Sequence, residues 1–245
     1  MNREKTHLVL IPAFNPGRLL GATVEGALAN WSDVWVVVDG STDGSHDALA
    51  AVGKPGMRVI VLPRNGGKGA AVLAGARDAL ASGFTHALVM DADRQHPEDR
   101  IGAFMAASMA SPGSVICGKP VFGPEAPLVR RLGRLLSVGI VRMETAGRGP
   151  ADPLFGFRVY PLAPLVRALG SGRRGRRYNF DPEAAVQLAW AGAPAINLEA
   201  PCRYLDRANG GVSHYRYLGD NLRMVAMHAR LLLELLAGRR GAPNP

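Results

Sequence analysis

Two carboxylates separated by a single residue are the sharpest chemical feature of the chain. Asp91 and Asp93 flank Ala92 directly after the apolar residues 87–90, and Gln95 follows two positions later. Paired carboxylates at the end of a strand are typical ligands of a hard divalent cation, which often bridges protein oxygens to substrate phosphates. The pair therefore predicts a site for Mg²⁺ or Mn²⁺ on a diphosphate, with a solvated acidic turn as the alternative.

Two further segments could bind a phosphorylated ligand. Asp39 ends a nearly continuous run of valines at residues 34–38, where its carboxylate could accept hydrogen bonds from a nucleoside base or ribose. Residues 65–69 read Asn-Gly-Gly-Lys-Gly; the glycines would let the backbone approach a ligand, and Lys68 could meet a phosphate near a helix N-terminus. The spacing of these residues does not fit a P-loop. It does not fit the dinucleotide fingerprint either, because Val72 stands where that fingerprint has its last glycine. A glycine-rich turn without a ligand is the alternative.

Three carboxylates in the second half of the chain are candidate catalytic groups. Asp181 and Glu183 stand at the start of a predicted helix, where either could serve as the general base that a hydroxyl acceptor needs. Pro182 follows Asp181, so an N-cap is the alternative role of Asp181, while Glu183 would also suit the helix dipole. Asp152 is the third candidate for an active-site contact.

The elements that must position these residues alternate along the first 120 residues. Strands are predicted at residues 7–11, 34–38, 58–62, 86–90 and 115–118, and helices at 17–30, from 45, at 68–81 and at 97–110. This alternation is typical of an α/β fold with a mainly parallel central sheet and helices on both faces, which binds ligands beyond the carboxyl ends of its strands. The polar loops should therefore meet at one edge of the sheet.

The second half of the chain is less regular. Helices are predicted at residues 128–143, 181–191 and 215–237, an extended segment at 196–204, a possible strand at 155–159 and a flexible basic loop at 170–177. No internal repeat is visible, so we expect a single domain over residues 1–245 with a C-terminal helical extension.

Charge is distributed unevenly along the chain, whose net charge is +9. Residues 1–120 carry 11 Lys and Arg against 11 Asp and Glu, whereas residues 121–245 carry 18 against 9. A basic second half suggests an anionic partner, although solvated arginines are the alternative. Two cysteines, the lack of a visible secretory signal and the lack of an apolar run of about 20 residues predict a cytoplasmic protein, soluble or peripheral on the inner face of the cell membrane.

The loop segments at residues 12–16, 37–45, 65–69 and 91–97 together resemble the family 2 glycosyltransferases of GT-A fold. Within this family they are most similar to the branch of dolichyl- and polyprenyl-phosphate sugar synthases. The resemblance continues through the D…GFR segment at residues 152–158, the acidic helix at 183–192 and the P…DR…G.S element at 201–213. It implies a nucleotide-sugar-binding half at residues 1–120, an acceptor half at 121–214, and a helix and tail at 215–245.

The resemblance implies an inverting, metal-dependent transfer of a sugar from a UDP- or GDP-sugar to a lipid or polyprenyl-phosphate acceptor. Donor contacts are implied for Pro12, Ala13, Asn15, Asp39, Lys68, Asp91, Ala92, Asp93, Gln95, Lys119, Arg207 and Ser213, with Mg²⁺ or Mn²⁺ held by Asp91 and Asp93. Pro16 stands where the family usually has Glu, and Val38 stands where it usually has Asp. Because of these two departures, the resemblance does not decide whether the donor carries UDP or GDP.

Rival functions are a nucleotidyltransferase, a nucleic-acid-binding module and a degenerate transferase that only binds its donor. The first would need a glycine-rich signature directly after the first strand, where residues 13–15 read Ala-Phe-Asn. An aromatic content of 6% and the acidic loops argue against nucleic acid as a partner. The basic helices at residues 128–143 and 215–237 could instead lie on an anionic membrane surface, with core packing as the alternative.

Overall fold

The computed structural model describes residues 6–47, 49, 53–123, 128–170, 175–203 and 217–238. Its strands are β1 (His7–Ala13), β2 (Val34–Asp39), β3 (Met57–Leu62), β4 (His86–Val89), β5 (Val115–Phe122), β6 (Arg158–Pro161) and β7 (Ala195–Cys202). Its helices are α1 (Leu19–Asn30), α3 (Lys68–Ala81), α4 (Ile101–Ala110), α5 (Leu128–Glu144), α6 (Leu162–Leu169), α7 (Phe180–Trp190) and α8 (Tyr217–Leu236), and a short 3₁₀ helix, η1 (Glu98–Arg100), precedes α4. The predicted donor residues Arg207 and Ser213 lie outside the described residues.

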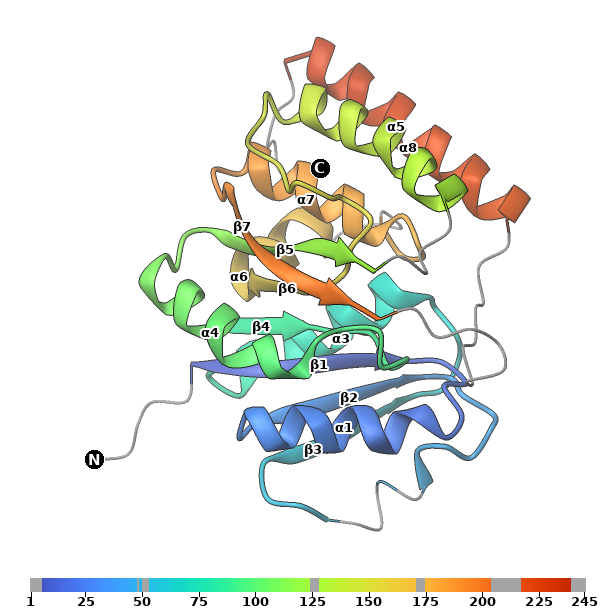
Figure 1. Ribbon diagram of the computed structural model, residues 1–245, viewed down its shortest axis with the longest axis vertical. Coiled ribbons are helices and arrows are strands. Elements are labelled where there is room, and N and C mark those ends of the chain that lie inside the picture. Colours follow the sequence, from blue (N-terminus) through green and yellow to red (C-terminus); the bar gives the residue numbers. More distant parts are fainter. Residues whose placement is uncertain are drawn as a thin grey trace.

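The strands form one sheet in the order β3-β2-β1-β4-β6-β5-β7 (Figure 1). Neighbouring strands are parallel, except that β6 runs antiparallel to both β4 and β5. The mainly parallel sheet predicted from the sequence is therefore confirmed. Because β1, β2 and β4 are mutually parallel neighbours, the loops that follow them emerge at the same edge.

The central strand β1 is buried on both faces, as its continuous apolar sequence requires. Leu8 and Leu10 pack in one hydrophobic cluster with residues of α3, α6 and α7. Val9 and Ile11 point to the opposite face and pack with residues of α1 and α4. Helices thus cover both faces of the sheet, as predicted (Figure 1).

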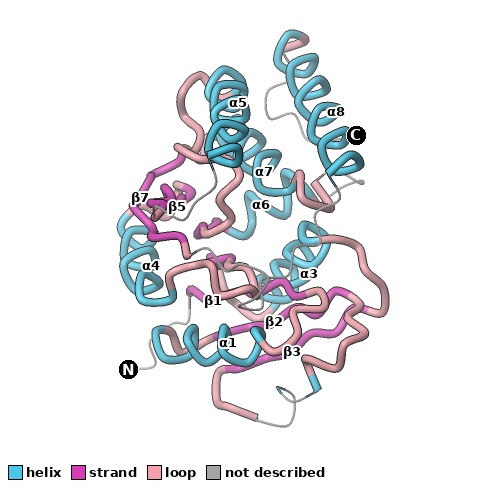
Figure 2. Tube along the Cα trace, turned by 45° about the vertical axis from the view of Figure 1, so that its right-hand side comes forward, coloured by secondary structure: helices cyan, strands magenta, loops and turns pink. Residues whose placement is uncertain are grey.

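The last helix forms an outer layer together with α5. A small cluster of Val141 from α5, Val186 from α7, and Met227 and Leu231 from α8 joins the three helices. In Figures 1 and 2, α5 and α8 lie at the end of the molecule farthest from β3. This arrangement agrees with the predicted C-terminal helical extension.

Several element boundaries differ from the sequence-based predictions. The strand expected at residues 155–159 is displaced, since residues 155–157 are irregular and β6 begins at Arg158. Helix α6, which follows β6 directly, was not predicted because its eight residues begin straight after Pro161 and include Pro164. The helix predicted from residue 45 falls largely outside the described residues.

Candidate active site

The loops after β1 and β2 are tied to each other by hydrogen bonds. Pro12 and Ala13 are buried at the end of β1, and the chain then turns through Asn15, which has a left-handed backbone with φ of 45°. The Asn15 amide donates to Ser41 Oγ at 3.0 Å, and its side-chain Oδ1 accepts from the Thr42 amide at 2.8 Å. Asn15 therefore shapes the edge of the site through its own backbone and side chain, whatever its contact with a donor.

Asp39 is bound to the glycine-rich loop in this structure. Its Oδ1 accepts from the Gly66 amide at 2.8 Å and its Oδ2 from the Gly67 amide at 2.7 Å. Burial raises the pKa of the carboxyl, while these two amide donors oppose that shift. The next residue, Gly40, has φ of 65° and approaches the Asn65 amide so closely that a Cβ would lie 2.5 Å from it. Asp39 thus fixes the loop that leads into α3, and its contact with a nucleoside stays a prediction.

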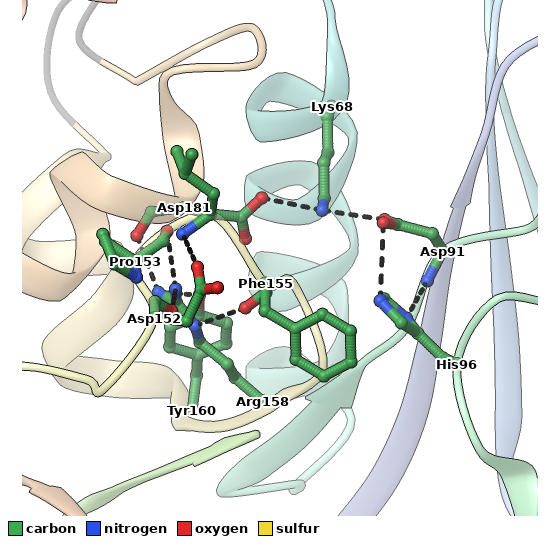
Figure 3. A network of polar contacts seen from close by, with 10 residues as sticks. Lys68, Asp91, His96, Asp152, Pro153, Phe155, Arg158, Tyr160 and Asp181 are labelled. Atoms are coloured by element: carbon green, nitrogen blue, oxygen red, sulfur yellow. Dashed lines mark hydrogen bonds and ion pairs between the residues drawn. The ribbon is translucent and has the colours of Figure 1, made fainter. Parts of the chain in front are cut away.

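Lys68, the first residue of α3, lies between two carboxylates from distant parts of the chain. Its Nζ is 2.7 Å from Asp91 Oδ1 and 2.8 Å from Asp181 Oδ2 (Figure 3). Burial alone would lower the pKa of the ammonium, but the attraction of Asp181 and Asp91 outweighs burial and raises it. The same contact lowers the pKa of Asp91 against the opposing effect of burial. Lys68 therefore joins the predicted metal carboxylate to a predicted catalytic carboxylate.

The acid pair after β4 has the composition of a hard-cation site. Burial, followed by the nearby charge of Asp91, raises the pKa of Asp93 to about 6. A divalent cation would relieve such repulsion between carboxylates, and the oxygens of Asp91 and Asp93 are of the type that would hold it. Among the described residues, no cluster of three or more His, Cys, Asp or Glu side chains that could hold a metal ion is found.

The turn that carries Asp93 is held by hydrogen bonds between side chains and its backbone groups. Arg94 has a left-handed conformation with φ of 60°, and Asp93 Oδ1 accepts from the Gln95 amide at 3.1 Å. The Ala92 carbonyl accepts from Thr23 Oγ1 at 3.1 Å, which fixes the other side of the turn. Left-handed non-glycine residues are uncommon and concentrate at functional sites.

His96 supports Asp91 from behind, a role that the sequence analysis did not assign. Its Nδ1 accepts from the Asp91 amide at 2.9 Å, and its Nε2 lies 3.7 Å from Asp91 Oδ2. The ring is buried against Phe155 and Phe157, with centroid separations of 4.9 and 5.4 Å. Burial lowers the pKa of His96 to about 4, so the ring is neutral at pH 7. The position of His96 after Asp-Ala-Asp-Arg-Gln was the only signal in the sequence.

A fully buried arginine organises the segment between the two halves of the site. Arg158, at the start of β6, donates to the carbonyls of Asp152, Pro153, Phe155 and Asp181, and to the Tyr160 hydroxyl (Figure 3). These acceptors satisfy all the guanidinium nitrogens, which makes full burial of the charge tolerable. The arginine therefore connects the loop that begins at Asp152 to the first turn of α7.

The three candidate catalytic carboxylates have different partners. Asp152 Oδ2 accepts from Arg134 Nε at 2.6 Å, and its Oδ1 accepts from the Leu154 amide at 2.8 Å. Glu183 is buried and forms a short ion pair with Arg230 of α8. Asp181 pairs with Lys68, and α7 begins at Phe180 with Asn179 as its N-cap residue. The alternative prediction that Asp181 caps the helix is therefore wrong, since Asp181 lies within the first turn.

The ion pair of Lys119 is with a residue outside the set of Lys68, Asp91 and the three candidate catalytic carboxylates. It lies on β5, its side chain is more than half exposed, and its Nζ is 3.9 Å from Glu199 Oε1 on the neighbouring strand β7. Its contact with phosphate stays a prediction. The side chain of Gln95 likewise stays a predicted donor contact, although its carbonyl accepts from the Arg203 amide at 3.1 Å.

Comparison with known proteins shows the family of the chain. The family described as Glycosyl transferase family 2 matches residues 8–160, which include the loops after β1, β2 and β4, Lys68 and Arg158. The chain belongs to this family. The family predicted from the loop motifs is therefore confirmed, and the enzyme class is that of a glycosyltransferase.

One curated relative of this family 2 glycosyltransferase is a dolichol-phosphate mannosyltransferase of Mycosarcoma maydis. The two are 28% identical over 165 residues, a match that covers 61% of this chain and 54% of the relative. The chain thus spans about half the length of the curated relative that it matches.

Solved structures show the GT-A fold of this family 2 glycosyltransferase. Mannosyl-3-phosphoglycerate synthase from Rubrobacter xylanophilus has a TM-score of 0.59 and 17% identity, with 96% of this chain and 75% of that chain covered. S. aureus TarS in complex with UDP-GlcNAc has a TM-score of 0.54 and 16% identity, with 91% and 66% covered. The predicted GT-A fold is thereby confirmed.

Proposed function

We propose that this glycosyltransferase moves a sugar from a nucleotide-sugar to a lipid or polyprenyl-phosphate acceptor, with inversion at the anomeric carbon. The observation that carries the proposal is the contact of Lys68 with both Asp91 and Asp181, because it joins the acid pair of the nucleotide half to a carboxylate of the acceptor half. The names of two similar proteins support the substrates, since one is a dolichol-phosphate mannosyltransferase and the other binds UDP-GlcNAc.

Asp91 and Asp93 would hold the metal ion of the donor diphosphate, with Gln95 close by. Family 2 glycosyltransferases generally use a divalent metal ion, and Mg²⁺ or Mn²⁺ suits two carboxylates. When bound, the ion would supply Lewis-acid stabilisation for the departing diphosphate. Residues of the chain would orient Asp91 for this role. His96 accepts a hydrogen bond from its backbone amide, and Lys68 pairs with its Oδ1.

A thermal-shift panel of UDP- and GDP-sugars, with and without Mn²⁺, tests the donor and the metal together. We expect one donor to raise the melting temperature only when Mn²⁺ is present, and Asp93→Ala to abolish that rise. Asp99→Ala, at an exposed acid of η1, is the matched control and should leave the rise intact. No stabilisation by any sugar nucleotide, or full stabilisation of Asp93→Ala, would contradict the donor-site assignment.

We further propose that α5 and α8 place the enzyme on an anionic membrane surface. Leu222, Val225, Leu233 and Leu236 are exposed on α8, and Leu135, Leu136 and Met143 on α5. In α8 these leucines and valine form a stripe with the exposed Ala226 and Ala229, at spacings of three and four residues. Within the described ranges, no helix is long and apolar enough to cross a bilayer.

Binding to vesicles tests this second part of the proposal. The wild-type protein should sediment with vesicles that contain phosphatidylglycerol and much less with pure phosphatidylcholine, because basic residues add attraction to anionic headgroups. The double variant Val225→Asp/Leu233→Asp should lose sedimentation, whereas Met109→Asp, at an exposed apolar position of α4, should retain it. Equal sedimentation of both variants would exclude α8 as the contact surface.

A further inference from the structure

The glycine-rich loop at the start of α3 is covered by a segment from the second half of the chain. A Cβ at Gly67 would lie 2.5 Å from the carbonyl oxygen of Arg176, and a Cβ at Gly69 would collide with the carbonyl oxygen of Gly175. The missing side chains of the two glycines therefore make room for residues 175–177. The space beside their α-carbons is filled by the chain itself and is not open to a phosphate.

Arg177 has a fixed backbone and an exposed side chain. Its Cα and Cγ lie 3.0 and 2.8 Å from the position of a Cβ at Gly67, so the stem of the side chain runs along this glycine. The Arg176 carbonyl accepts from the Ala70 amide at 3.2 Å, and the Arg177 carbonyl accepts from the Phe180 amide at 3.0 Å. In the part of the chain that the structure describes, Arg177 forms no ion pair with a carboxylate. Its guanidinium is therefore available to an anion.

The position of this arginine is defined by the loop on which it packs. Gly67 donates its amide to Asp39 Oδ2 at 2.7 Å. Burial raises the pKa of Asp39, while the backbone amides bound to its oxygens and the positive charge of Arg177 oppose that shift. Lys68 follows Gly67 and holds Asp91 Oδ1 at 2.7 Å. Arg177 thus lies at the loop that links the predicted nucleoside contact to the predicted metal ligand.

The charges around this loop leave a place for a further cation when a diphosphate binds. The carboxylates concerned are those of Asp39, Asp91, Asp93 and Asp181. Lys68 would offset one of these negative charges and a divalent ion two, so one remains before the negative charge of the diphosphate is added. A guanidinium suits phosphate oxygens because its planar N–H groups can donate two parallel hydrogen bonds.

We propose that Arg177 binds the diphosphate of the donor from the acceptor half of the chain; this rests on the sugar transfer proposed above. Its guanidinium donates hydrogen bonds to phosphate oxygens, and Lys68 keeps its contacts with Asp91 and Asp181. The glycines at positions 67 and 69 seat the backbone of residues 175–177, which carries the arginine to the phosphates. Arg177 is thus a donor-binding residue.

Calorimetric titration of the full chain with UDP and with GDP, in the presence of Mn²⁺, tests this inference. We expect one of the two nucleotides to bind the wild type, and to bind Arg177→Gln about 10–100-fold more weakly because a charge-assisted contact is lost. Arg177→Lys keeps the charge without the planar fork, so its affinity should lie between the two. Arg167→Gln, at an exposed arginine of α6, makes the same change in charge and should bind as the wild type does.

Two further measurements separate a phosphate contact from other roles. Added NaCl should narrow the gap in affinity between wild type and Arg177→Gln, because salt screens exposed charges. A gap that is equal at low and high salt would place Arg177 on the nucleoside and overturn the proposal. Without nucleotide, both Arg177 variants should melt at the wild-type temperature, since the side chain is exposed. A fall in melting temperature that parallels the loss of affinity in both variants would mean a purely structural role, which also overturns it.

Failure of this inference can be told from failure of the proposed function. Wild-type affinity in Arg177→Gln, for a nucleotide that the wild-type protein does bind, would overturn the role of Arg177 and leave sugar transfer intact. Absence of binding by the wild type to UDP, to GDP and to every sugar nucleotide of the thermal-shift panel would instead refute the proposed function itself.

Discussion

Replacement of Lys68 by methionine removes the only positive charge found, among the described residues, in contact with both Asp91 and Asp181. The Lys68 side chain is mostly buried, and its Nζ lies 2.7 Å from Asp91 Oδ1 and 2.8 Å from Asp181 Oδ2. In the variant both carboxylates would lose this cation. Breaking a buried ion pair by removing one partner costs about 3–5 kcal/mol. For a domain of this size, about 2–4 °C of melting temperature corresponds to each kcal/mol, so we expect a loss of roughly 6–20 °C.

Thermal unfolding at pH 7 without metal measures this loss. Lys54→Met is the matched control, because Lys54 lies 3.9 Å from Glu25 at the surface and such pairs contribute at most about 1 kcal/mol. Lys68 lowers the native pKa of Asp91, so its stabilisation is present above the ordinary pKa of an aspartate and is lost as the pH falls through the lowered value. The gap between Lys68→Met and wild type should therefore narrow as the pH falls below about 4.

Added Mn²⁺ should raise the melting temperature of Lys68→Met more than that of the wild type, because a divalent cation can neutralise the Asp91 carboxylate that has lost its lysine partner. The reasoning would be refuted by a loss of less than about 2 °C relative to Lys54→Met, or by a gap that stays constant from pH 7 to pH 3. Either result would mean that Lys68 contributes no more than a surface pair.

Three smaller changes test the parts around this lysine. The pKa of Asp93 is raised to about 6, so the folded protein binds this proton more tightly than the unfolded chain, and stability should fall as the pH rises from about 4 to 6. Asp93→Asn should flatten that slope and be more stable than wild type at pH 7 by about 1–3 kcal/mol, as measured by urea unfolding with EDTA present. His96→Phe keeps the aromatic packing but loses the acceptor for the Asp91 amide, and the Mn²⁺ concentration needed for the donor-induced thermal shift should rise about 10–100-fold. Gly156→Ala would crowd Lys68 and should destabilise by about 1–3 kcal/mol, whereas Gly102→Ala, with open space around it, should be neutral or stabilising in chemical unfolding.

Local patterns in the sequence predicted the parts of the fold that obey a period or end a strand. The buried strands β1 and β2 are continuous apolar runs, and the loops after them are marked by abrupt polar residues. The alternation of strands and helices predicted a parallel sheet, and therefore predicted that Asp39 and Asp91 lie at the same edge of it. The position of these carboxylates was therefore predictable, although their identity as ligands still depends on the proposed donor.

Contacts between distant residues were beyond the sequence patterns. Lys68 and Asp181 are separated by 113 positions, and nothing local to either residue distinguishes this pairing from a phosphate contact or a helix cap. Arginine is usually found at the surface, yet Arg158 is completely buried because five oxygen acceptors converge on it: three loop carbonyls, one carbonyl of α7 and the Tyr160 hydroxyl of its own strand. Such convergence depends on tertiary folding, so neither role could be assigned beforehand.

The antiparallel strand β6 has a consequence for dividing the molecule. It comes from the later part of the chain, yet it sits between β4 and β5, both from the earlier part. A donor-binding fragment cut after residue 123 would leave an open slot in the middle of its own sheet, with unpaired backbone groups on both flanking strands. The two halves of this enzyme are therefore not exchangeable modules. A chimaera designed to change acceptor specificity would have to take β6 from the same parent as β4 and β5, with which it pairs.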